Sequence, residues 1–526
     1  MQGKKHYQEK FFVSFQLSDH VPEDNFYRRL KGLIDFNFLY KRTVVYYGKE
    51  GQKSVDPVVF MKLMLVGYLE NLNSDRRIVC TAKMRLDILY FLGYNLDEEL
   101  PWHSTLSRTR QLYGQDVFTE VFRVILKQCI DKGMVSGRRQ AVDGVYVKAN
   151  ASLDSMVERE ILTDAATYSK ELDANQEEIK VPVVDINKDC PREYNELAPK
   201  KNPTNKTHYS PSDPDAKMSV KPGKATALNY LGQVSVDTAS HIITHIQSFK
   251  ADQRDCQCLP SVIKKLVENL RQNDLLVEEI VADKGYSSGE ALKALEDNNI
   301  TGYIPNRTQF VYERPGFTYH HEEDYYSCPN NKKLSYKGTF ETLDGVYNKE
   351  YRASRKECNL CPLKTKCSVY GKYNTVINET TDKPYYQRMH IRMQTKKAKT
   401  LMKRRQATVE PVIGTLVNYM GMKKVNSKGL QQANKCMTLS AVAYNIKKLM
   451  KYKSVLVQSK VQEMQQNLKT ALNYLLNNFT PKTRFFNLNN CVKDFISDTN
   501  NKMFYFEIMC RQFIRISCAT ATQQKK

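Results

Sequence analysis

The chain has 526 residues, of which 41% are hydrophobic, so it is long enough for two to four domains with a substantial core. Its 80 Lys and Arg residues against 57 Asp and Glu residues give a formal net charge of +23, which makes nucleic acid the expected partner; the alternative is a basic protein whose excess lysines only solvate its surface. No apolar run approaches the roughly 18 residues of a membrane-spanning helix, and the 13 cysteines are too dispersed for a disulfide scaffold, so we expect a cytoplasmic protein with reduced thiols.

Residues 10–135 have the pattern of a compact helical region. Asp56 and Pro57 predict the start of a helix with a largely buried apolar stripe, and Ser104 is expected to cap a second helix. That second helix carries Arg108 and Arg110. We predict either a helix-turn-helix-like module that binds DNA or a helical bundle with solvated basic faces.

From residue 136 the pattern changes to short apolar strands. The run 141–147 predicts a strand that carries Asp143, and the runs 229–237 and 241–247 predict a hairpin. A short buried strand is predicted to end just before Asp283, at the start of a loop in which Gly285 allows the turn. An acid at a strand end is often only a turn former, but a strand end is also a rigid mount for a functional group.

Helices and insertions separate these strands. Segments 257–272 and 290–298 predict helices, so a mixed sheet with helices is expected. Residues 151–225 are polar and fit an extended insertion or a DNA-contacting arm.

Four cysteines form a second candidate site. Cys358 and Cys361 make a C-x-x-C pair that suits one Zn²⁺, and Cys328 and Cys367 would complete four thiolates. We predict a structural zinc site, with ordinary free thiols as the alternative.

Glu410 is the third candidate acid and lies downstream of the basic stretch 396–405. Three carboxylates such as Asp143, Asp283 and Glu410 offer the hard oxygen ligands that Mg²⁺ prefers, and the surrounding positive charge suits a polyanion. These features together predict two-metal phosphodiester chemistry.

The contexts of the three acids resemble the three signature blocks of DDE-type insertion-sequence transposases of bacteria. These blocks are the segments 143–150, 282–286 and 409–414. The resemblance extends from about residue 10 to about residue 450, and it includes the segment 101–110 and the closing segment 439–449. Two positions depart from the family pattern, because Val145 replaces a hydroxyl residue and Val417 replaces a basic residue.

The resemblance implies a ribonuclease-H-like α/β core with a mixed sheet flanked by helices, preceded by an all-helical domain. It implies the following organisation: a helical DNA-binding domain over 1–135, a catalytic domain over 136–450 with a Cys-rich insertion at about 310–380, and a helical tail of unknown role over 451–526.

The implied activity is Mg²⁺-dependent hydrolysis and strand transfer with two metal ions held by Asp143, Asp283 and Glu410, for which Mn²⁺ can substitute. The implied partners are double-stranded DNA, namely terminal inverted repeats and target DNA, and a second copy of the chain in a homodimer or larger oligomer on the nucleoid DNA. The DNA-contacting candidates are Arg108, Arg110, Lys148, Lys284, Lys396, Lys397, Lys403, Arg404 and Arg405. A DNA-binding relic without cleavage activity and a nuclease of the same fold are the alternatives.

Overall fold

The structure, a computed structural model, describes residues 15–48, 50, 54–159, 203–220, 225–307, 314–342, 345–371 and 375–452. Most of the predicted polar insertion and all but the first two residues of the predicted tail lie outside the described residues. Residues 1–452 group into one compact unit and residues 453–526 into a second. Within the described ranges, no helix combines the length and apolar character that crossing a bilayer requires.

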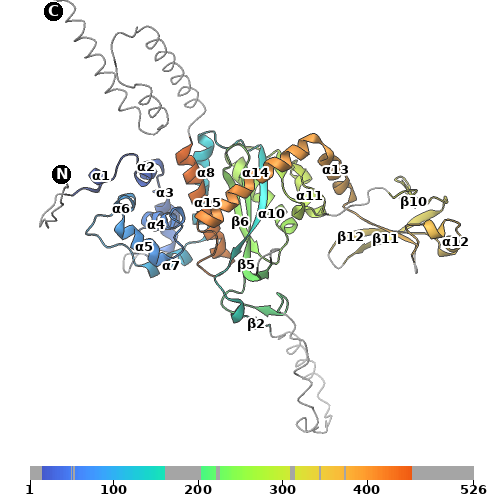
Figure 1. The fold of residues 1–526 in the computed structure, drawn as a ribbon, viewed down its shortest axis with the longest axis horizontal. Coiled ribbons are helices and arrows are strands. Elements are labelled where there is room, and N and C mark those ends of the chain that lie inside the picture. The colour runs from blue at the N-terminus through green and yellow to red at the C-terminus, as the bar shows by residue number, and fades with distance from the viewer. Residues whose placement is uncertain are drawn as a thin grey trace, which may run out of the picture. The chain divides into compact units, whose positions relative to one another are not determined.

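The region before the sheet is helical, as its sequence predicts (Figure 1). Asp56 caps α4 because its carboxylate accepts hydrogen bonds from the N–H groups of Val58 and Val59, and Pro57 occupies the first turn. The expected cap at Ser104 is wrong, since α7 begins one residue earlier at His103. The elements are α1 (Leu17–His20), α2 (Phe26–Leu33), α3 (Phe38–Thr43), η1 (Val44–Tyr46), α4 (Pro57–Leu69), α5 (Asp75–Met84), α6 (Leu86–Leu92), α7 (His103–Leu112) and α8 (Gln115–Asp131).

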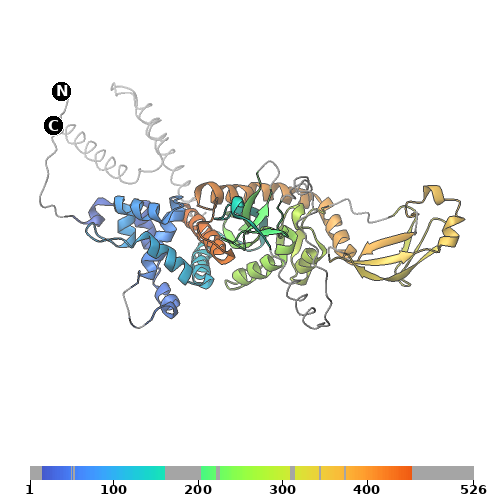
Figure 2. The same ribbon diagram turned by 90° about the horizontal axis from the view of Figure 1, so that it is seen from below.

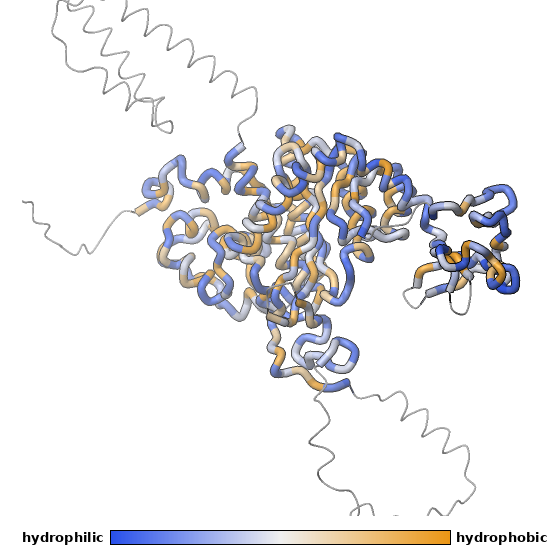
Figure 3. The backbone as a smooth tube through the Cα atoms, turned by 45° about the vertical axis from the view of Figure 1, so that its right-hand side comes forward, coloured by the Kyte–Doolittle hydropathy of each residue, from blue (hydrophilic) through white to orange (hydrophobic). Residues whose placement is uncertain are grey.

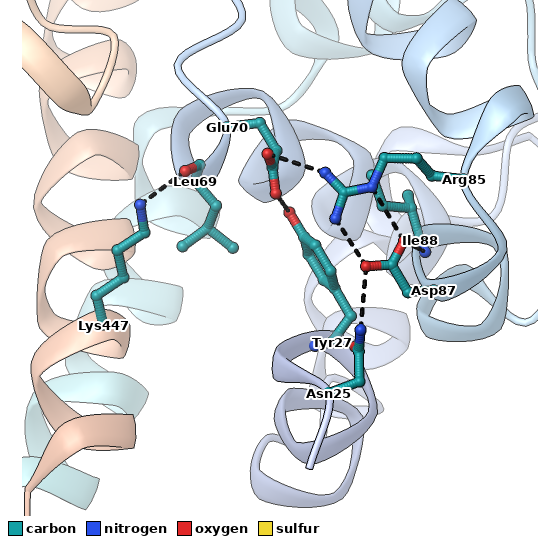
Figure 4. A network of polar contacts seen from close by, with 8 residues as sticks. All are labelled: Asn25, Tyr27, Leu69, Glu70, Arg85, Asp87, Ile88 and Lys447. Carbon is teal, nitrogen blue, oxygen red and sulfur yellow. Dashed lines mark hydrogen bonds and ion pairs between the residues drawn. The ribbon is translucent and has the colours of Figure 1, made fainter. Parts of the chain in front are cut away.

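A polar network joins these helices to one another and to a helix from the far end of the unit (Figure 4). The Tyr27 hydroxyl donates to Glu70 at 2.6 Å, and Arg85 pairs with both Glu70 and Asp87. The Lys447 ammonium on α15 (Leu430–Lys451) donates to the carbonyl that ends α4, at 2.8 Å. The last helix of the unit therefore packs against the amino-terminal helices.

The central sheet has the strand order β6-β5-β1-β7-β8. In this sheet β5 is antiparallel to both β1 and β6, whereas β7 and β8 run parallel to β1. This order and these directions are those of a ribonuclease-H-like sheet, which confirms the predicted fold class. The strands are β1 (Arg139–Lys148), β5 (Ala227–Asp237), β6 (Ile243–Lys250), β7 (Glu279–Val281) and β8 (Thr301–Tyr303), and the short β4 (Lys217–Ser219) pairs with one end of β5.

Helices cover both faces of this sheet (Figure 2). One face carries α14 (Lys396–Tyr419) and α15, and α10 (Asp255–Arg271) packs against the other, followed by α11 (Gly289–Asp297). Because side chains alternate across a strand, Asp143 and Val145 point to the α14 face and Gly144 to the α10 face. Apolar residues gather in these strands and helices, as the orange segments of Figure 3 show.

The Cys-rich insertion contains its own antiparallel sheet, in the order β13-β12-β11-β10-β9. A small separate core of Tyr326, Leu334, Tyr351 and Ile377 holds it together. Its elements are β9 (Thr318–His320), β10 (Tyr325–Ser327), β11 (Lys333–Glu341), β12 (Tyr347–Arg352), α12 (Arg355–Asn359), η5 (Lys364–Lys366) and β13 (Val376–Thr380), and α13 (Lys383–Gln394) then leads to α14. The described part of the insertion at 151–225 contains η2 (Leu153–Ser155) and the two-stranded pair of β2 (Val157–Glu158) and β3 (His208–Tyr209).

Candidate active site

Asp143 lies on β1, and Asp283 lies two residues past the end of the neighbouring parallel strand β7. Ala141 on β1 pairs with Val281, the last residue of β7, so an aspartate comes two residues after each member of this pair. The Oδ1 atom of Asp143 accepts from the Gly144 N–H at 2.9 Å, and that of Asp283 accepts from the Gly285 N–H at 2.8 Å. The strand pairing and these short loops therefore hold two carboxylates side by side.

Arg405 of α14 is the cation next to Asp143. Its Nη1 lies 3.2 Å from Asp143 Oδ2, and the arginine is buried, with 7% of its surface exposed. Burial raises the pKa of Asp143, Arg405 and the Gly144 N–H act against that rise, and the charge of Asp283 adds to it. Asp143 is thus a partly desolvated carboxylate whose ionisation depends on a nearby positive charge.

Glu410 is exposed on the same helix, five residues after Arg405. At about 1.5 Å per residue it lies roughly 7.5 Å further along the helix axis. Val409 and Val412 on either side of it are buried, so this part of α14 is packed in the core. In the described part of the chain, no set of three or more His, Cys, Asp or Glu side chains is gathered closely enough to hold a metal ion. The three acids have the oxygen chemistry of Mg²⁺ ligands, with the two aspartates paired and the glutamate on a neighbouring helix.

Asp255, Gln233 and Tyr286 lie next to these acids; only Tyr286 falls within one of the signature blocks, the segment 282–286. Gln233 on β5 pairs with Gly144 and donates to Asp255 Oδ1 at 2.7 Å. The buried Tyr286 hydroxyl donates to Gln233 Oε1. An acid that follows a hairpin at the start of a helix is a weak sequence signal, because such acids commonly offset the helix dipole.

Some of the residues predicted to contact DNA are exposed, and others already form ion pairs. Lys148 ends β1, where its backbone pairs with the segment at Lys423 and Lys424, so three exposed lysines meet there. Lys284 is exposed directly after Asp283. Besides Lys397, the exposed basic candidates of α14 are Lys396, Lys403 and Arg404.

Three other basic candidates already have acidic partners. Lys397 pairs with Glu279, and Arg405 pairs with Asp143. On α7, Arg108 is exposed, whereas Arg110 is 3% exposed and pairs with Asp75. The side chain of Arg110, which was predicted to contact DNA, is therefore buried in the fold.

The four predicted zinc ligands line one small cavity in the Cys-rich insertion. Cys328 Sγ accepts from the Lys332 N–H at 3.3 Å, and Cys361 Sγ accepts from Asn330 Nδ2 at 3.5 Å. All four thiols are free of disulfides. Their chemistry suits Zn²⁺, but their sulfur atoms are not gathered into a ligand set among the described residues.

Comparisons with known proteins identify two transposase domains in this chain. Residues 15–112 match the family described as "Transposase domain (DUF772)", and residues 327–450 match the family described as "Transposase DDE domain". The second match contains Glu410 and the four cysteines but neither aspartate. No curated protein gives a significant match.

Two solved structures are distantly similar. The piggyBac transposase synaptic complex with hairpin DNA is 11% identical, with a TM-score of 0.28, covering 90% of this chain and 84% of that one. The Mos1 transposase paired-end complex with left transposon end is 10% identical, with a TM-score of 0.15, covering 49% of this chain and 61% of that one. Scores this low do not establish a common fold. The two family matches confirm the predicted resemblance to DDE-type transposases over residues 15–112 and 327–450, and the order of the central strands confirms the ribonuclease-H-like core.

Proposed function

We propose that this chain is a DNA transposase that binds transposon ends, cleaves them and joins them to target DNA, using Asp143, Asp283 and Glu410. The observation that carries the proposal is that Asp143 on β1 and Asp283 just past the end of β7 each follow the paired residues Ala141 and Val281 by two positions, and that α14, which carries Glu410, pairs with Asp143 through Arg405. Asp143 is held by β1, and Asp283 is held by the end of β7 and by its hydrogen bond from the Gly285 N–H.

In this proposal the three carboxylates hold two Mg²⁺ ions, which would activate the attacking oxygen and stabilise the leaving oxygen of a phosphodiester. Hydrogen bonds from the Gly144 and Gly285 N–H groups orient the carboxylates of Asp143 and Asp283, respectively. Arg405 keeps Asp143 ionised against its burial. Lys148, Lys284, Lys403 and Arg404 lie exposed on the elements that carry the acids and would contact DNA phosphates. Val145 is buried, so its side chain contributes packing at the position where the family has a hydroxyl.

Isosteric amides test the proposal. Asp143→Asn, Asp283→Asn and Glu410→Gln should each abolish Mg²⁺-dependent nicking of transposon-end DNA and leave binding of that DNA within a few fold, because each removes a metal ligand but no phosphate contact. Asp297→Asn, at an exposed acid that ends α11, is the matched control and should nick at the unaltered rate. Nicking by Asp283→Asn at a substantial fraction of the unaltered rate would contradict the assignment. Binding without any nicking by the unaltered protein would favour a DNA-binding relic.

A further inference from the structure

Three side chains joined by hydrogen bonds, Asp255, Gln233 and Tyr286, lie next to the two aspartates. Asp255 is the first residue of α10, on the sheet face opposite α14. Its carboxylate accepts from Gln233, whose amide oxygen in turn accepts from the Tyr286 hydroxyl. Tyr286 lies three residues after Asp283, and Gln233 is the β-sheet partner of Gly144. These three hydrogen-bonded side chains therefore link β5, the strand paired with β1, to the segment that follows Asp283.

The glycines beside the two aspartates leave room for this same carboxylate. A Cβ atom at Gly144 would lie 2.5 Å from Asp255 Oδ1. A Cβ atom at Gly285 would lie 2.9 Å from Asp283 Oδ1 and 3.3 Å from Asp255 Oδ2. Neither glycine has a positive φ, so backbone conformation does not require glycine at either place. The close approach of Asp255 and, at Gly285, of Asp283 supplies the reason.

The charge of Asp255 also reaches the site. Burial raises the pKa of Tyr286 well above its ordinary value, and Asp255, Asp143 and Asp283 each add to the rise, in that order. Three carboxylates thus act on the phenol, and of these Asp255 acts most strongly. A role confined to the dipole of α10 does not explain why Gln233 fixes the carboxylate toward the sheet.

We propose that Asp255 is a positioning residue for the divalent-metal site of Asp143 and Asp283, supporting the backbone at Gly144 and Gly285 and adding a third negative charge behind them. Asp255 acts through these neighbours and is not assigned as a metal ligand. The inference rests on the proposed function, since it assumes that the two aspartates bind metal.

Binding of Mn²⁺ to the full-length, DNA-free protein, followed by electron paramagnetic resonance, tests the proposal without requiring activity. Asp255→Asn keeps the size of the side chain and an oxygen that can accept from Gln233, but it removes the charge. It should weaken Mn²⁺ binding roughly tenfold, the usual effect of losing a group behind the metal ligands. Its thermal midpoint and its binding of end DNA without metal should not change. Asp255→Glu, which restores the charge, should recover part of the affinity.

Asp252→Asn is the matched control, because Asp252 is an exposed acid three residues earlier and the substitution removes the same charge. It should bind Mn²⁺ as the unaltered protein does. Gly144→Ala supplies a second route, since its methyl group would displace the Asp255 carboxylate and should also weaken Mn²⁺ binding.

The outcomes separate the two proposals. Equal Mn²⁺ affinity in Asp255→Asn and the unaltered protein would overturn the role of Asp255, while Mg²⁺-dependent nicking by the unaltered protein would still support the transposase. Weakened Mn²⁺ binding in Asp255→Asn, together with no nicking by the unaltered protein, would support Asp255 and overturn the transposase. No specific Mn²⁺ binding by the unaltered protein would overturn the role of Asp255.

Discussion

Arg405 on α14 pairs with Asp143 on β1, so one ion pair joins the helix that carries the third acid to the strand that carries the first. The arginine is buried, and its Nε atom has no hydrogen-bond partner among the described residues. A buried cation with so few partners depends on Asp143 as much as Asp143 depends on it.

Arg405→Ala should therefore change the pH dependence of the reaction. Arg405 opposes the rise in the Asp143 pKa that burial causes, so its removal should raise that pKa further. Metal binding needs the ionised carboxylate, and the acidic limb of the pH profile for nicking should move to higher pH. We also expect a loss of stability of about 3 kcal/mol, because the variant leaves Asp143 buried without its cation.

Arg404→Ala is the control for this variant, since Arg404 is the adjacent exposed arginine. It should keep the pH profile and lose affinity for DNA, with a flatter dependence of binding on salt. Coincident acidic limbs for Arg405→Ala and the unaltered protein would show that Arg405 does not control the ionisation of Asp143.

Arg108 and Arg110 should behave differently although they lie two residues apart on α7. Arg110 is buried, pairs with Asp75 and donates to Ser427 at 3.3 Å, so Arg110→Ala should destabilise the fold by about 3 kcal/mol. Arg108 is exposed, so Arg108→Ala should leave the thermal midpoint unchanged and weaken binding to end DNA severalfold. Thermal unfolding and a gel-shift titration check the pair. A stable Arg110→Ala protein with weakened DNA binding would restore the DNA role expected from its sequence.

Local sequence patterns predicted most of the sheet but little of what surrounds the aspartates. The hairpin of β5 and β6, the capped start of α4 and the strand before Asp283 each follow from hydrophobic pattern or a cap within a few residues. The strand order could be predicted only through the family resemblance, because long-range pairing leaves no local pattern.

Contacts between distant segments account for what the sequence did not reveal. Arg405 and Asp143 are 262 positions apart, and nothing in the basic stretch 396–405 distinguishes the one buried arginine from its exposed neighbours. Asp255 comes close to Gly144 only after β5 and β6 have paired. Gly144 and Gly285, which follow the two aspartates, were the one available signal of this contact. A glycine that no turn requires often marks a close approach of another group.

The four cysteines of the insertion should bind one zinc ion in a structural role. They line one cavity next to a small core of aromatic and aliphatic residues, and four thiolates would close a tetrahedral site. Cys361→Ser should lower the zinc content, increase proteolysis between residues 310 and 380 and reduce nicking through DNA positioning. Elemental analysis of protein purified without chelator is the measurement, and Cys80→Ser, at an exposed cysteine of α5, is the control. Less than about a tenth of an equivalent of zinc in the unaltered protein, with all four thiols freely alkylated, would leave only ordinary cysteines.

His245 should make the central sheet sensitive to acid. It is buried on β6, within 3.4 Å of both Gln247 Oε1 and Asn269 Nδ2, and burial lowers its pKa to about 4. Above the ordinary histidine pKa of about 6.5 both the folded and unfolded chains hold it neutral, whereas at lower pH the unfolded chain takes up a proton first. The stability that depends on neutral His245 is therefore present above pH 6.5 and is lost as the pH falls toward 4. His245→Gln removes this titration, so between pH 7.5 and pH 5 it should lose less stability than the unaltered protein, by on the order of 2 kcal/mol.

Urea unfolding at the two pH values measures the difference, and His390→Gln, at an exposed histidine, should behave as the unaltered protein. An equal loss in His245→Gln would show that the acid sensitivity arises elsewhere.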